Sequence, residues 1–211
     1  MIVPKLFEDC SFISAGFCDA EESLDLEQPI LMNQVHGANA FVISAAPQDP
    51  PDCDALVTTT PNLKLTVKTA DCAPALFVDP QNHIIAATHA GWKGAFQGIL
   101  ENTILTMIKL GASLDTIRVA IGPHLTKNSF QVSPQMQSLF PQTEFCFFEK
   151  TSSGIYFDFS AYLAHRLQRA GIHKIEISSI DTLQDPAYNS YRRDPSNPAR
   201  QYSFIQINGE G

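Results

Sequence analysis

Short apolar runs recur along the chain, and they restrict its fold more than any other feature of the sequence. Each run has five or six residues and is rich in Val, Ile, Phe or Thr, and most are bounded by turn-forming residues. Runs of this length and composition are typical of β-strands. The predicted strands cover residues 40–44, 54–59, 65–69, 74–79, 84–89, 117–122, 174–178 and 202–207.

Helices are fewer than strands in the predicted fold. Apolar residues at i, i+3 and i+4 spacing predict an amphipathic helix over 93–110, with Gly111 as its C-cap. A Ser-Pro pair predicts a short helix over 134–140. A third helix is expected to begin at Asp158 or Ser160.

Strands with helices between them favour a layered α/β (α+β) domain, with a mixed β-sheet flanked by helices. The chain has 211 residues, 44% of them hydrophobic, and is long enough to bury one sizeable core. The Pro-rich segments 45–54 and 192–200 are interpreted as loops rather than domain linkers. We therefore expect a single domain over residues 1–211.

Charge and cysteine content restrict the partners and the compartment. The net charge is −8, and the basic residues are scattered apart from Arg192-Arg193, which argues against nucleic acid or an anionic membrane as partner. No stretch approaches the roughly 20 apolar residues of a membrane span, and Glu8 and Asp9 interrupt any apolar N-terminal signal. The five cysteines form no regular framework, so a reducing cytoplasm is expected.

Three polar side chains lie where predicted strands begin or end. The stretch "LTVKTADCAPALFVD" is apolar except around Asp71-Cys72, and an unpartnered carboxylate buried there would cost several kcal/mol. The chain must therefore turn at this point, or the pair must have partners elsewhere. "NQVHG" places His36 before a strand, and "IAATHAGWKG" places His89 at the end of one. Strand ends of layered α/β folds are where ligands collect.

Two imidazoles and a thiolate would suit zinc, which takes His and Cys ligands and keeps an open position in catalytic sites. The separations, 36 residues from His36 to Cys72 and 17 from Cys72 to His89, match no zinc-finger spacing. The residues alone therefore leave open that both histidines are ordinary loop residues and Cys72 a buried thiol. The other histidines are interpreted as structural or solvated, with His124 ambiguous.

Further candidates lie beside these positions. Trp92 could stack on a substrate ring or cover the core, and Asp71 could act as acid or base, orient a ligand, or accept N–H bonds in a turn. Gly91 and Gly94 bracket Lys93 at a helix start, where an anion could bind.

The blocks "QVHG", "TADCAPAL", "HAGWKG", "AIGP" and "SYRRD", in this order, resemble the laccase-domain family. Its members are variously called polyphenol oxidases, multicopper oxidase-like proteins and purine nucleoside phosphorylases. The resemblance implies a bulky mixed sheet and a catalytic zinc bound by His36, Cys72 and His89. We expect Asp71, beside one ligand, to stay out of the coordination sphere and to orient a histidine or accept N–H bonds.

The resemblance also implies an activity: phosphorolysis of adenosine, inosine, guanosine and methylthioadenosine, and deamination of adenosine. The partners would be purine nucleosides and phosphate. Phosphate requires cations, and Lys93, Arg192, Arg193 and Arg200 are available. Arg192 is expected to face the pocket, because neighbours in an extended segment point to opposite sides. The chain departs from the family pattern in its short segment before "QVHG", and in Lys93 where Arg is common.

Three other functions remain open. A metal-free cysteine hydrolase, or an amidase that edits peptidoglycan precursors, would use Cys72 as nucleophile and His89 as base. A copper oxidase would need many His ligands around clustered copper ions, and the chain has six scattered histidines, so copper is less favoured than zinc. The third is a binding module that keeps a metal for stability.

Overall fold

A six-stranded mixed sheet forms the centre of the computed structural model, which describes residues 1–209. The outer pairs β11–β7 and β3–β2 are parallel, and the other pairs are antiparallel. In spatial order the strands are β11 (Lys174–Ile177), β7 (Arg118–Ile121), β5 (Ala73–Asp79), β6 (Ile84–Ala90), β3 (Ala55–Thr58) and β2 (Ala40–Val42).

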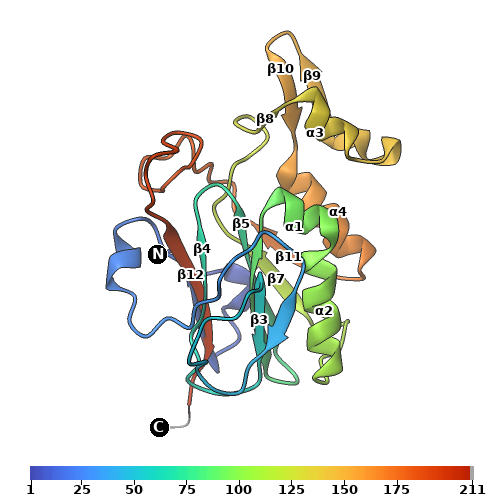
Figure 1. Cartoon of the computed structure of the whole chain (residues 1–211). Helices are drawn as coiled ribbons and strands as arrows, with labels where there is room; N and C mark the ends of the chain where they lie inside the picture. The colour runs from blue at the N-terminus through green and yellow to red at the C-terminus, as the bar shows by residue number, and fades with distance from the viewer. Residues whose placement is uncertain (210–211) are drawn as a thin grey trace.

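Two antiparallel three-stranded sheets accompany it. One packs on a face of the central sheet, and the other forms an arm that projects from the body together with α3 (Figure 1). The first contains β1 (Ile13–Phe17), β12 (Gln201–Ile207) and β4 (Leu65–Thr69), and the second contains β8 (Gln131–Val132), β10 (Gly154–Phe157) and β9 (Phe148–Thr151).

Helices cover the opposite face of the central sheet (Figure 1). The α-helices are α1 (Trp92–Gln97), α2 (Ile99–Lys109), α3 (Pro134–Ser138) and α4 (Phe159–Arg169), and the 3-10 helices are η1 (Lys5–Phe7), η2 (Glu22–Asp25) and η3 (Gln142–Phe147). No helix within residues 1–209 combines the length and apolar character that a membrane span requires.

The central strands are buried on both faces because successive side chains point to opposite sides. On β5, Ala75 and Phe77 pack toward the helices, with Leu100 and Met107 among their cluster. Leu76, on the same strand, packs toward the smaller sheet. Every residue of β5 and β6 is buried, which explains why the sequence shows continuous apolar runs there rather than alternation.

The structure confirms the predicted layered fold and all eight predicted strands to within two residues at each end. The single helix expected over 93–110 is wrong, because the chain turns at Gly98, whose φ of 99° separates α1 from α2. A side chain is disfavoured in that conformation, so glycine permits the break. Gly111, with φ 104°, follows the end of α2 as expected. Strands β1, β8, β9 and β10 were not predicted.

The polar strand ends meet at one edge of the layered body. β4 belongs to the smaller sheet and β5 to the central one, so residues 70–72 carry the chain from one sheet to the other. The end of β6 lies opposite the start of β5, with Pro74 paired to His89. The start of β3 lies beside the same end of β6. The fold therefore brings these segments together.

Candidate metal centre

Cys72 lies in the turn between β4 and β5, and Asp71 shapes that turn. Asp71 has a φ of 84°, and its main-chain oxygen accepts a hydrogen bond from Leu125 N at 2.9 Å. Its carboxylate accepts from Thr182 Oγ1 and from Arg192 N, each at 2.7 Å. The carboxylate thus anchors the turn to the C-terminal loop, and Cys72, which follows it, is half-buried.

His89 lies near the end of β6 and is only 2% exposed. Its Nδ1 lies 2.8 Å from Oδ1 of Asp54, and its main-chain N donates to Asp54 O at 2.7 Å. Asp54 directly precedes β3 and has no exposed surface. The carboxylate holds the ring by Nδ1, which leaves Nε2 of His89 available as a ligand atom.

The same carboxylate holds the loop that carries His36. Oδ1 of Asp54 accepts from His36 N at 3.0 Å, and Oδ2 accepts from Gly37 N at 2.7 Å. His36 has a φ of 59°, which is uncommon outside glycine and requires such support. Gln34 adds two more bonds, because its side-chain amide pairs with the main-chain N and O of Lys68 at 2.9 and 2.8 Å.

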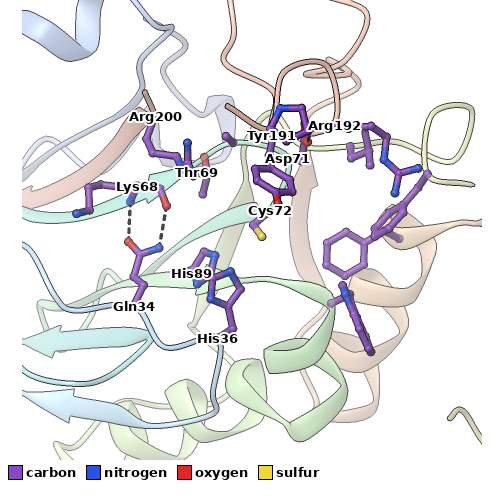
Figure 2. Close-up of a pocket in the computed structure, with 16 residues that line it drawn as sticks. Gln34, His36, Lys68, Thr69, Asp71, Cys72, His89, Tyr191, Arg192 and Arg200 are labelled. Atoms are coloured by element: carbon purple, nitrogen blue, oxygen red, sulfur yellow. Dashed lines mark hydrogen bonds between the residues drawn. The ribbon is translucent and has the colours of Figure 1, made fainter. Parts of the chain in front are cut away.

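His36, Cys72 and His89 converge, as the family resemblance implies (Figure 2). One ligand atom from each lies within 4.8 Å of the others, and the imidazole rings are nearly perpendicular, at 87°. Zn–N and Zn–S bonds are about 2.0–2.3 Å long, so small side-chain adjustments would let the three atoms share one ion. Two nitrogens and a sulfur are also the donors that zinc prefers.

Gly91 closes one side of this group. A Cβ built on it would lie 3.1 Å from Cys72 Sγ, 3.3 Å from His36 Cδ2 and 3.6 Å from His89 Cε1. Its φ of −73° is ordinary, so glycine is required here for space rather than for backbone freedom. A side chain at residue 91 would press into the ligand cluster. The glycine thus preserves a space shaped by the three candidate ligands.

Charge within the group favours a deprotonated thiol. Burial alone would raise the pKa of Cys72, but His89 and His36 beside the sulfur lower its pKa to about 6. Burial would likewise lower the pKa of His89, whereas the Cys72 sulfur and the Asp54 carboxylate raise it to about 9. A thiolate is the form of cysteine that binds metals and attacks electrophiles. The group can therefore act as a ligand set or as a thiolate–imidazolium pair.

The three side chains line a cavity of about 590 Å³, a size suited to a small-molecule ligand. Trp92, Phe130 and Phe159 form an aromatic side of the cavity, with Tyr191 at its exposed border. Its basic residues are Lys68, Arg192 and Arg200. Among the described lining residues Asp71 is the acidic one, and both of its oxygens accept hydrogen bonds.

Only some of the basic and aromatic residues predicted to bind substrate line the cavity. Trp92 and Arg192 line the cavity, whereas Arg193 lies outside its lining and donates to main-chain oxygens. The guanidinium of Arg192 donates to Ser129 O and Gln131 O at 3.2 and 2.7 Å and covers the ring of Phe130.

Lys93 is exposed, lies outside the cavity lining, and has its Nζ over the ring of Trp92. Lys93 directly follows Trp92 in the first turn of α1, and consecutive helical residues project from the helix in different directions.

Of the two roles expected for Asp71, the structure shows an accepted N–H bond, from Arg192, and no hydrogen bond to either histidine. The backbone at Asp71 has a positive φ, and its carboxylate contacts Thr182 and the C-terminal loop. Asp54 makes the contact to His89 instead. The sequence did carry a signal for Asp54. Like His36, it is a polar residue that lies just before an apolar strand. Its role became visible only once β3 was paired with β6.

Known proteins match this chain over most of its length. Residues 15–208 match the family described as multi-copper polyphenol oxidoreductase laccase. A protein of Streptomyces coelicolor named purine nucleoside phosphorylase is 34% identical over 174 residues, which cover 81% of this chain and 72% of that protein. A protein of the same name from Deinococcus radiodurans is 33% identical over 177 residues, covering 83% of this chain and 69% of its own length.

A solved structure also shares the fold. The crystal structure of the hypothetical protein YfiH from Bacillus licheniformis superposes with a TM-score of 0.78 at 28% sequence identity. The match covers 89% of this chain and 79% of that one. The bulky mixed sheet with flanking helices is therefore a shared architecture.

Proposed function

The chain belongs to the multi-copper polyphenol oxidoreductase laccase family, and on this premise we propose that it is a zinc-dependent purine nucleoside phosphorylase. The observation that carries the proposal is the convergence of His36, Cys72 and His89 in a cavity with an aromatic and a basic side. The names of the two relatives support the reaction class, because both are called purine nucleoside phosphorylases.

The aromatic side of the cavity suits a purine base. Trp92 is half-buried and Tyr191 is exposed, so these rings offer flat apolar surfaces on which a heterocycle can stack, whereas Phe130 and Phe159 are almost fully buried in the cavity wall. The basic side suits the second substrate, because phosphate carries negative charge that must be compensated when it attacks the ribose C1′. A nucleoside lying across the candidate ligands would then have its base and the incoming phosphate on opposite sides.

We infer that the three side chains hold one zinc ion. Bound zinc supplies a Lewis-acid centre at the cavity floor. Asp54 keeps Nδ1 of His89 occupied and so directs Nε2 to the metal, while Gly91 leaves the space that the ligands need. Zinc is favoured over copper because laccase chemistry requires several copper ions with many His ligands. Within residues 1–209 only this group of three candidate ligands is found.

The proposed substrates are adenosine, inosine, guanosine and methylthioadenosine, with deamination of adenosine as a second activity. All contain a purine joined to a ribose or a thioribose, and the aromatic side offers stacking that tolerates different substituents on the base. Deamination would use the same metal centre without phosphate. We also propose a cytoplasmic location, which agrees with the absence of disulfides among the described cysteines.

One alternative is supported by a specific observation. The lowered pKa of Cys72 and the raised pKa of His89 describe a thiolate–imidazolium pair, which is how cysteine hydrolases activate their nucleophile. In such an enzyme Asp54 would orient His89 as the third member. A hydrolase or amidase of this kind needs no metal and would be inactivated when one binds.

The test is the metal and phosphate dependence of nucleoside turnover. Protein purified without a His tag is stripped with a chelator, reloaded with zinc or copper, and assayed on inosine with and without phosphate. We expect zinc and phosphate together to be required for release of hypoxanthine and ribose 1-phosphate. Cys72→Ala should be inactive, whereas Cys146→Ser, which changes an exposed cysteine, should retain activity.

Turnover that persists after metal removal would contradict the proposal. Loss of activity on zinc loading, with hydrolysis of an amide or ester by the stripped protein, would favour the cysteine hydrolase. Phosphorolysis restored by copper but not by zinc would contradict the choice of metal.

A further inference from the structure

Two buried polar atoms on the strand pair β4–β12 have no hydrogen-bond partner within residues 1–209. They are Oγ1 of Thr69 and Nε2 of Gln201. Thr69 is 1% exposed and Gln201 2% exposed, so water does not satisfy them from the outer surface. Buried polar groups are normally paired, which makes such atoms candidates for ligand contacts. Thr69 lines the cavity beside the metal centre.

The two side chains lie on the same face of the smaller sheet. Thr69 and Gln201 are directly opposed in the antiparallel register, and opposed residues project to the same side. Oε1 of Gln201 accepts from Asn189 N at 2.9 Å, which identifies Nε2 as the free end of the amide. A hydroxyl and an amide, both able to donate, therefore lie side by side on this face of the sheet, and Thr69 is the one of the two that lines the cavity.

Arg200 adds a positive charge to these donors. It precedes β12 and lines the cavity, and Figure 2 shows its guanidinium directed toward Thr69. Its Nη1 donates to Asn197 O and Ala199 O at 3.1 and 2.7 Å. Among the described residues, neither its Nη2 nor its Nε makes a hydrogen bond, and no carboxylate pairs with it. The guanidinium thus keeps donors free for a ligand.

The other two basic residues of the cavity are less suited to hold an anion. Arg192 is tied to a distant segment, because its guanidinium donates to Ser129 O and Gln131 O and lies over the ring of Phe130. The hydrogen bonds of Arg200, by contrast, go to carbonyl oxygens of its own loop. Lys68 alternates with Thr69 along β4, and Figure 2 shows its side chain running away from the ligand cluster. The unpartnered donors beside the metal centre are therefore Thr69 Oγ1, Gln201 Nε2, and Nη2 and Nε of Arg200, none of which has an acceptor among the described residues.

We propose that Thr69 and Arg200, with Gln201 beside Thr69 on the neighbouring strand, form a subsite for a phosphate group. Phosphate oxygens accept several hydrogen bonds and prefer arginine as a charged partner. These donors are the evidence that a phosphate group binds here. That the bound group is the phosphate that attacks the nucleoside rests on the proposed function. The phosphate group could belong to inorganic phosphate or to the 5′-phosphate of a nucleotide.

The test measures binding directly and so does not depend on turnover. The shift in melting temperature of zinc-loaded protein is titrated with inorganic phosphate and, separately, with adenosine and adenosine 5′-monophosphate. Arg200→Gln should weaken binding of the phosphate group by about 10- to 100-fold, and Thr69→Val by about 3- to 10-fold. Thr69→Val preserves shape and removes only an unpartnered hydroxyl, so it should fold. Arg169→Gln, at an exposed arginine of α4, should not change binding.

The ligand series separates the two sources of the phosphate group. If inorganic phosphate stabilises the wild type and the effect weakens in both variants, free phosphate is the ligand. If only the monophosphate binds more tightly than adenosine, and the variants remove that advantage, the ligand is a nucleotide. Equal phosphate-group affinity in wild type and variants, or none in the wild type, overturns the subsite. Binding with the expected losses but without phosphorolysis would contradict the proposed function and leave the subsite standing.

Discussion

Replacing Asp54 by asparagine should weaken both the metal centre and the fold. The fully buried carboxylate of Asp54 accepts three hydrogen bonds, from His89 Nδ1 at 2.8 Å, His36 N at 3.0 Å and Gly37 N at 2.7 Å. Asparagine has one acceptor oxygen and one NH2 group. In either orientation its NH2 must face at least one of these N–H donors.

The magnitude follows from those contacts. A buried donor left unsatisfied costs about 1–3 kcal/mol, and the lost bonds to a charged acceptor add about 1.5–3 kcal/mol. We therefore expect the free energy of unfolding of the metal-free protein to fall by about 3–5 kcal/mol. Zinc affinity should fall on the order of 10- to 100-fold, because the ring of His89 and the loop of His36 are no longer fixed.

Two measurements check this prediction. Urea unfolding in the presence of a chelator gives the stability, and competition with a chromophoric chelator gives the zinc affinity. The control is Asp52→Asn, an exposed residue two positions earlier whose carboxylate contacts only Asn33 in the hydrogen-bond network of residues 1–209. It should change stability by less than about 0.5 kcal/mol. Unchanged zinc affinity in Asp54→Asn would refute the assignment of this carboxylate as the support of the site.

Three further changes probe separate parts of the account. Gly91→Ala should lower zinc affinity while the protein stays folded, since its Cβ would lie 3.1 Å from Cys72 Sγ; unchanged affinity in the same competition assay would contradict the packing argument. Asp71→Asn should retain stoichiometric zinc by elemental analysis but lose activity, because its carboxylate anchors the turn and the C-terminal loop rather than the metal. Burial alone would raise the pKa of Asp79, but hydrogen bonds from Asn82, Ser113 and Thr116 lower this pKa below the ordinary value of 3.8. The ionised Asp79 carboxylate therefore stabilises the fold above pH 3.8, and this stabilisation is lost as the pH falls through the lowered pKa. Asp79→Asn should therefore be less stable at pH 7 and show a flatter stability profile below pH 4 in urea unfolding, and an unchanged profile would show that other groups dominate there.

The strands could be predicted from sequence because their signal is local. Runs such as 74–79 and 84–89 are apolar throughout, and the structure buries them on both faces. β1 was missed because "ISAGF" contains a serine and a glycine and fits no apolar run. The helix break at Gly98 was missed because the apolar spacing continues across it, and a single glycine within a helical pattern does not decide between a weak point and a turn.

The site was only partly predictable because its parts are distant in sequence. The spacing of His36, Cys72 and His89 carried no recognisable pattern, and the family resemblance was needed to group them. Asp54 supports two of them through strand pairing, and no local rule connects residue 54 with residue 89. Thr69 appeared as an ordinary strand residue, since only the assembled cavity shows that its hydroxyl is buried without a partner.

The most direct test of the central claim is the metal content of the folded protein. Untagged wild type, Cys72→Ala and Cys146→Ser are purified in parallel, and elemental analysis for zinc and copper is normalised to protein concentration. We predict one zinc per chain in the wild type and in Cys146→Ser, and almost none in Cys72→Ala, with circular dichroism showing that all three are folded. Equal zinc content in Cys72→Ala and wild type, or a wild type that takes up no zinc when supplied with it, would contradict the account.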